Sequence, residues 1–201
     1  MSLTILQPPE VPLVSLEETK AYLRLEGNAE DALILRLIAA STESLEAITG
    51  QSFLQKTYQY TAPLELFGSE QEGGSHIFAT SVVRIPLPRP PIQRVLSVVL
   101  KAGLQEQEIP AERHSVIAHH GPAQLTVCLP PLSPCKAPYA LVVSFLAGFG
   151  ETARSVPEAL CLATLMLAAD AYEKRDGFSA KAGLPQGVLA LIQPYRLLNM
   201  L

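Results

Sequence analysis

The chain has 201 residues, of which 48% are hydrophobic and 17% charged, and its formal net charge is −4. This composition supports a buried core and excludes wholesale disorder. No apolar run reaches the roughly 18 residues that a membrane-spanning helix needs, and the N-terminus lacks the basic and apolar regions of a secretory signal. We therefore expect a soluble, cytoplasmic protein with reduced thiols.

The excess acid is confined to the first fifty residues, which hold three Lys or Arg against eight Asp or Glu. Residues 51–150 hold seven against six, and residues 151–201 hold five against five. A protein that grips nucleic acid needs a basic surface to neutralise phosphates. The charge pattern therefore argues against tight binding of DNA.

The N-terminal segment predicts two helices. Ser15 and Glu18 form a capping box that starts the first helix, and Gly27 is its expected end. Asn28 is the expected N-cap of a longer second helix, and Gly50 is its expected stop. This second helix carries an apolar stripe at helical spacing, made of Ile34, Ile38, Leu45 and Ile48.

The middle of the chain predicts β structure. Eleven of the 17 prolines fall between residues 51 and 150, which excludes long helices there. Runs of β-favouring residues predict strands at 57–61, 82–85, 95–101, 124–129 and 140–146. We expect residues 65–75 to form a hairpin tip or loop. The prolines around Arg89 predict a stiff, extended connector.

The C-terminal segment predicts two further helices. Ser155 and Glu158, with Pro157 between them, indicate a second capping box and helix start. Residues 159–169 contain no charge, so neighbouring subunits are expected to help bury this helix. The side chains that we expect at such a subunit interface are Leu160, Leu162, Leu165 and Met166. A short helix opened by Pro185 and closed by Pro194 follows.

These elements predict an α+β fold, in which a helical bundle of two N-terminal and two C-terminal helices carries an inserted antiparallel β region. The predicted N-terminal helical part spans residues 1–55, the β insertion 56–147 and the C-terminal helical part 148–201. Together they form one domain with an insertion. The two helical parts must pack on each other, because neither could bury its apolar stripe alone.

No group of residues predicts catalysis, a cofactor or a metal site. His114, His119 and His120 cluster, but no nucleophile motif accompanies them. Cys128 and Cys135 lack the short spacing of structural zinc sites. The three cysteines of the chain are too few for a disulfide framework.

Several motifs occur in order along nearly the whole chain. They lie at residues 12–25 (PLVSLEETKAYLRL), 30–34, 45–50, 85–91, 147–150, 156–160, 184–188 and 194–196. This ordered set resembles a family of head–tail connector (adaptor) proteins of tailed bacteriophages, which also occurs in prophages and gene transfer agents.

The resemblance implies a structural protein of the virion neck, assembled in the bacterial cytoplasm, with no enzymatic activity and no cofactor. It implies a homo-oligomeric ring, matching the twelve-fold portal, that extends the DNA exit channel. The implied partners are the portal protein and a tail-side stopper or tail completion protein, and DNA passes through the channel without specific binding. The acid excess agrees, because such a conduit should repel the DNA backbone.

The apolar tail after Pro194 is the candidate segment for docking on the portal or on an adjacent subunit. Its residues are Tyr195, Arg196, Leu197, Leu198, Met200 and Leu201. The alternative is that the tail folds back on its own core. A glycine-rich loop at residues 68–75 is a second candidate, for contact with the tail or for lining the channel.

Two other classes of function stay open. One is a small-ligand or nucleic-acid binding module, which would bind DNA with salt-dependent affinity. The other is a hydrolase that uses His114, His119 and His120, an interpretation that the missing motifs disfavour.

Overall fold

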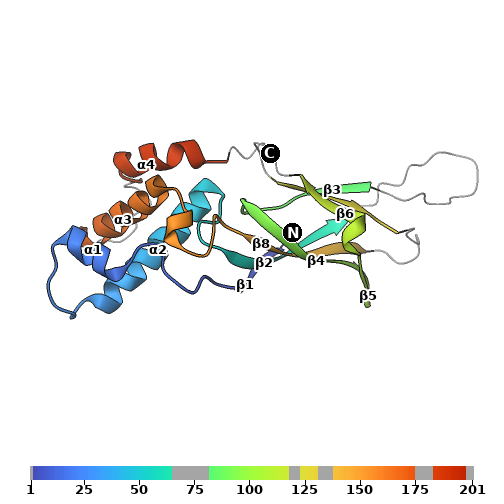
Figure 1. Cartoon of the computed structure of the whole chain (residues 1–201), viewed down its shortest axis with the longest axis horizontal. Helices are drawn as coiled ribbons and strands as arrows, with labels where there is room; N and C mark the ends of the chain where they lie inside the picture. The colour runs from blue at the N-terminus through green and yellow to red at the C-terminus, as the bar shows by residue number, and fades with distance from the viewer. Residues whose placement is uncertain (1, 65–81, 118–122, 131–137, 175–182, 198–201) are drawn as a thin grey trace, which may run out of the picture. The chain divides into compact units, whose positions relative to one another are not determined.

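A computed structural model describes residues 2–64, 82–117, 123–130, 138–174 and 183–197. Its helices and strands (Figure 1) are β1 (Ser2–Gln7), α1 (Leu16–Leu23), α2 (Asp31–Thr49), β2 (Lys56–Leu64), β3 (Val82–Pro86), β4 (Ile92–Ala102), β5 (Gln105–Glu108), β6 (His114–Ile117), β7 (Gln124–Cys128), β8 (Tyr139–Ala147), α3 (Glu158–Glu173) and α4 (Gln186–Ile192). The predicted α+β class, with a helical part and an inserted antiparallel β region, is confirmed.

The chain forms two compact units. The β unit comprises Met1–Pro8 and Lys56–Ala147, and the helical unit comprises Pro9–Gln55 and Gly148–Leu201. Each unit has its own hydrophobic core. The chain therefore leaves the helical unit after Gln55 and returns to it at Gly148, after the inserted strands.

The β unit contains two antiparallel sheets. The larger has the strand order β1-β2-β8-β4-β5, and the smaller has the order β3-β7-β6. All five predicted strands are present, as β2, β3, β4, β7 and β8. The core of this unit draws side chains from both sheets, including Tyr58, Leu125 and Phe145.

The β unit also differs from the sequence-based expectation. Strands β1, β5 and β6 were not predicted. Strands β5 and β6 have only four residues each, and such short runs become strands only when a partner supplies the hydrogen bonds. Arg89 has φ 62°, a left-handed conformation, so the proline-rich connector turns there and is not extended throughout. The predicted loop at 65–75 lies outside the described residues.

The helical unit is built from α1 to α4. Its core combines residues of α2, such as Ile34 and Ile38, with residues of α3 and α4, such as Leu160 and Ile192. The expected packing of the two helical parts on each other is therefore confirmed. Along the described ranges, no helix combines the length and the apolar character needed to cross a lipid bilayer.

The start of α1 follows the prediction, but its end does not. The hydroxyl of Ser15 accepts a hydrogen bond from the backbone N–H of Glu18 at 3.1 Å, as a capping residue should. The helix ends at Leu23, because Arg24 already takes the left-handed conformation with φ 55°. Gly27, the expected end, lies in the loop beyond it.

Of the next three predicted helix boundaries, one is confirmed and two are wrong. Asn28 is not the N-cap of α2, which begins after Glu30 without a side-chain cap. Gly50 does end α2, with φ 75° and its N–H donating to the carbonyl of Glu46 at 3.0 Å. Ser155 does not cap α3, because it lies in a short 3₁₀ helix at Ala153–Ser155 and Pro157 precedes the first helical residue.

Glu46 is a buried carboxylate in the last turns of α2. Its Oε1 accepts a hydrogen bond from the N–H of Phe53 at 2.8 Å, and Phe53 is itself fully buried. This contact ties the end of α2 to the segment that leaves the helical unit. A buried backbone donor that loses its acceptor is expensive.

We predict that Glu46→Ala lowers the free energy of unfolding by about 2 kcal/mol, because it leaves the buried N–H of Phe53 without its hydrogen-bond acceptor. Glu46→Gln keeps an acceptor oxygen and should cost less. Glu43→Ala, at an exposed position of the same helix, should change stability by less than about 0.5 kcal/mol. Urea denaturation measures all three, and equal effects at positions 43 and 46 would contradict the assignment.

Candidate interaction surfaces

The described residues bring no reactive side chains together. In these ranges, no group of three or more His, Cys, Asp or Glu side chains is arranged to hold a metal ion. His114 is half-buried at the start of β6, whereas His119, His120 and Cys135 lie outside the described residues. Cys128 and Cys161 are free thiols.

Cys161 is buried in α3, and its thiol is mostly protonated at neutral pH. Burial raises the pKa of its thiol to about 11, and the negative charges of Glu158 and Glu18 add to the rise. Its Sγ lies 3.9 Å from the carbonyl oxygen of Ala153. Only a thiolate attacks electrophiles, so this position is a packing residue.

We predict that Cys161 in the folded protein is alkylated by iodoacetamide at pH 8 far more slowly than in urea. With a pKa of about 11, only about one thiol in a thousand is ionised at pH 8, and the rate should climb with pH up to that value. Mass spectrometry of the peptide containing Cys161 gives the rate. Equal rates in buffer and urea would show that the thiol is accessible and unperturbed.

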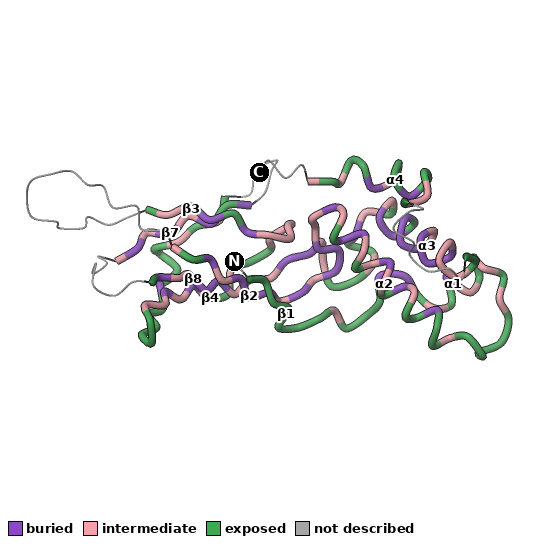
Figure 2. The backbone as a smooth tube through the Cα atoms, turned by 180° about the vertical axis from the view of Figure 1, so that it is seen from behind, coloured by how far each residue is buried: buried purple, intermediate pink, exposed green. Residues whose placement is uncertain are grey.

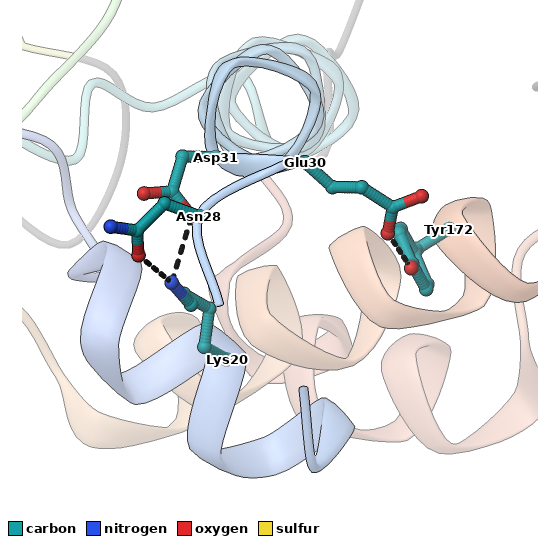
Figure 3. A network of polar contacts seen from close by, with 5 residues as sticks. All are labelled: Lys20, Asn28, Glu30, Asp31 and Tyr172. Atoms are coloured by element: carbon teal, nitrogen blue, oxygen red, sulfur yellow. Dashed lines mark hydrogen bonds and ion pairs between the residues drawn. The ribbon is translucent and has the colours of Figure 1, made fainter. Parts of the chain in front are cut away.

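A polar network holds the loop between α1 and α2 (Figure 3). The Nζ of Lys20 donates to Oδ1 of Asn28 at 3.0 Å and to Oδ1 of Asp31 at 2.8 Å. The hydroxyl of Tyr172, near the end of α3, donates to Oε2 of Glu30. Asn28, expected as a helix cap, therefore serves to orient Lys20.

The acidic side chains of the N-terminal segment are mostly exposed. Asp31 is balanced by Lys20, and Glu46 is buried. The remaining six are exposed: Glu10, Glu17, Glu18, Glu26, Glu30 and Glu43. The helical unit therefore carries an acidic surface.

The side chains expected at a subunit interface separate into two groups. Leu160 and Leu165 are buried in the core of their own helical unit. Leu162 is 39% exposed, and Met166 is half-buried beside Gly187 of α4. Of the four, Leu162 is thus the one with a large surface left for a neighbour.

The first residues of the C-terminal tail lie on the end of α2. The N–H of Leu197 donates to the carbonyl of Thr49 at 2.9 Å, and Nε2 of Gln51 donates to the carbonyl of Tyr195 at 2.8 Å. Arg196 lies between these two anchors. Leu198, Met200 and Leu201, and the loop at 68–75, lie outside the described residues.

The structure also exposes apolar side chains that the sequence analysis did not single out. Leu33 and Leu35 are exposed on α2, and β1 exposes Leu3, Ile5 and Leu6. On α2 these residues adjoin the predicted core stripe, so the sequence offers no signal to separate them from it. On β1, a run of β-favouring residues ahead of Pro8 could have indicated a strand.

Comparisons with known proteins found one family model and several solved structures that resemble this chain. Residues 13–79 match the family model of phage gp6-like head-tail connector proteins, which confirms the family resemblance of the sequence. No curated protein matches the chain.

Three of the similar solved structures match the whole of this chain and 98% of their own chain. They are the neck of an empty gene transfer agent (GTA) particle computed with C6 symmetry (TM-score 0.76, 22% identity), the virion of a native GTA particle (0.74, 23%) and the neck of a native GTA particle computed with C12 symmetry (0.73, 21%). At these identities the likeness shows a common fold.

Proposed function

We propose that this chain is a structural head–tail connector of a tailed phage or phage-like particle, because residues 13–79 match the model of the phage gp6-like head-tail connector family. The observation that carries the proposal is the full-length fold that it shares with chains of GTA particles, two of which come from structures of the particle neck. It would act in the neck of the virion, after assembly in the bacterial cytoplasm.

The proposed working form is a homo-oligomeric ring of twelve copies below the portal. The ring extends the DNA channel and docks the stopper or tail completion protein. Support comes from the C12 symmetry named for one similar neck and from the exposed Leu162, which offers a contact to a neighbouring copy. We assign the chain no enzymatic activity, since connectors act through shape and contact.

The charge distribution supports passage of DNA without specific binding. The helical unit holds eight Lys or Arg against 13 Asp or Glu, and the β unit holds seven against six. A surface with an excess of acidic residues repels phosphates, so DNA would pass through the channel without binding to it.

Deletion of the gene tests this proposal. Particles without the chain should package DNA but fail to retain it or to join a tail, and a plasmid copy should restore them. Normal, tailed, infectious particles after deletion would overturn the proposal. Salt-dependent DNA binding by the purified chain, measured by fluorescence anisotropy, would instead favour a nucleic-acid binding module.

Two truncations test the proposed docking of the tail on the portal. Removal of residues 198–201 leaves the anchor between Leu197 and Thr49, whereas removal of residues 197–201 also deletes it. We expect both variants to lose portal binding about equally, and only the second to lose about 1 kcal/mol of stability. Pull-down with purified portal and urea denaturation measure the two effects. Full binding without residues 198–201 would contradict a docking role for the tail.

A further inference from the structure

We propose that the outer edge of β1 pairs with β5 of a second copy of this chain, so that the five-stranded sheets of neighbouring copies join edge to edge. This inference rests on the proposed ring and names a surface that closes it. It follows from the exposure of β1, from the different chemistry of the two sheet edges, and from the direction of their strands.

The first observation is an uncovered part of the core face. Leu3 and Ile5 of β1 pair with Tyr60 and Tyr58 of β2, and directly paired residues point to the same face of a sheet. Both tyrosines are buried, yet Leu3 is 37% and Ile5 50% exposed. The core face thus continues onto β1, where the described residues do not cover it. Figure 2 marks β1 as exposed.

The backbone of β1 is open at the same place. The strand is the outermost of its sheet, and all six of its residues are exposed. Edge strands are commonly protected by charges, prolines or short length. The β1 sequence SLTILQ contains no charge and no proline, and its irregularity is a register shift between Ile5 and Gln7. This edge is therefore chemically suited to accept another strand.

The opposite edge differs in a complementary way. Strand β5 has four residues. Its Glu106 and Glu108 lie on the face of the sheet that points away from the core, and Oε1 of Glu106 lies 2.7 Å from Nζ of Lys101. Two β5 edges would repel each other, because their carboxylates would meet. Beside β1, those carboxylates would instead lie next to Ser2 and Thr4, whose hydroxyls can donate hydrogen bonds to them.

The strand directions allow this joint around a ring. Every neighbouring pair in the five-stranded sheet is antiparallel, so the two outer strands, β1 and β5, run the same way. Copies related by a rotation can then add β5 of one to β1 of the next as a parallel pair. Such a contact uses two different surfaces, as a closed ring requires. With only four residues in β5, it is weak in isolation and is reinforced by the other contacts of the ring.

Cysteine cross-linking in assembled particles tests the joint. In a background of Cys128→Ser, Cys135→Ser and Cys161→Ala, the chain carries Thr4→Cys together with either Glu106→Cys or Glu108→Cys. After mild oxidation, we expect one of these two double variants to give a ladder of covalent oligomers on a non-reducing gel. A mixture of single variants should stop at dimers.

Three results separate the possibilities. Dimers from Thr4→Cys alone would mean that β1 pairs with β1, which overturns the proposal. If each double variant is incorporated into particles but neither gives a ladder, neighbouring copies contact each other through other surfaces. That result would overturn the β1–β5 contact but not the proposed connector function. Normal particles from which the chain is absent would overturn the proposed function itself.

A matched pair of substitutions gives an independent readout. Ile5→Lys places a charge on the uncovered core face and should weaken ring formation on the portal by about tenfold. Ile117→Lys makes the same change at a similarly exposed position of the smaller sheet and should have no effect. Circular dichroism checks that both variants stay folded. Equal ring formation by the two variants would contradict the joint.

Discussion

Gly148→Ala is expected to destabilise the helical unit by about 3 kcal/mol or more. Gly148 has φ +127°, and a Cβ built on it would lie 2.4 Å from the carbonyl oxygen of Leu54 and 2.7 Å from the nitrogen of Gln55. Both are backbone atoms, which cannot rotate away as the end of a side chain can. The substitution therefore combines an unfavourable conformation with a clash.

The backbone cannot easily move to relieve this clash, because hydrogen bonds join the segment 53–55 to the segment 148–150. The N–H of Gln55 donates to the carbonyl of Gly150 at 2.8 Å, and the N–H of Phe149 donates to the carbonyl of Phe53 at 2.9 Å. Moving the chain far enough to admit a methyl group would break at least one of these bonds in a buried region.

Gly27→Ala is the matched control for this prediction. Gly27 also has a positive φ, of 81°, in the same unit, but nothing lies within 4 Å of its added Cβ. It should cost about 1 kcal/mol, from backbone conformation alone. Urea denaturation compares the two variants. If Gly148→Ala were no worse than Gly27→Ala, the close approach to Leu54 would be wrong.

The helix boundaries show how far local rules reach. Gly50 was predicted correctly, because the apolar stripe ends where a residue suited to positive φ follows. Gly27 was predicted wrongly, because Arg24 takes the left-handed conformation three residues earlier. The rule expresses a preference for glycine and says nothing of Lys20 reaching across the loop to Asn28 and Asp31.

The missed strands and the surfaces depend on contacts between distant residues. The six residues of β1 become a strand because β2 offers partners fifty or more positions away in the sequence. In the charge-free part of α3, all sides look alike in the sequence, so nothing distinguishes buried Leu160 from exposed Leu162. The proposed connector would work through such surfaces. The family resemblance could therefore be predicted from ordered motifs, whereas the contact residues could not.

Phe145→Ala is expected to lower the stability of the β unit by about 4 kcal/mol. Phe145 is fully buried in β8, which pairs with both β2 and β4. Its ring stacks on Tyr58, with the ring centroids 5.7 Å apart and the planes at 22°. Removing the ring leaves a cavity at the centre of the sheet that rigid strands on both sides cannot close. Phe145→Leu fills most of the space and should cost about 1.5 kcal/mol.

Hydrogen exchange should show where the loss from Phe145→Ala falls. Because each unit has its own core, protection should drop in β2, β4 and β8 while α2 and α3 keep theirs, and Gly148→Ala should produce the reverse pattern. A uniform drop in both units would mean that the two cores unfold together. In that case the stability of each unit would depend on the other.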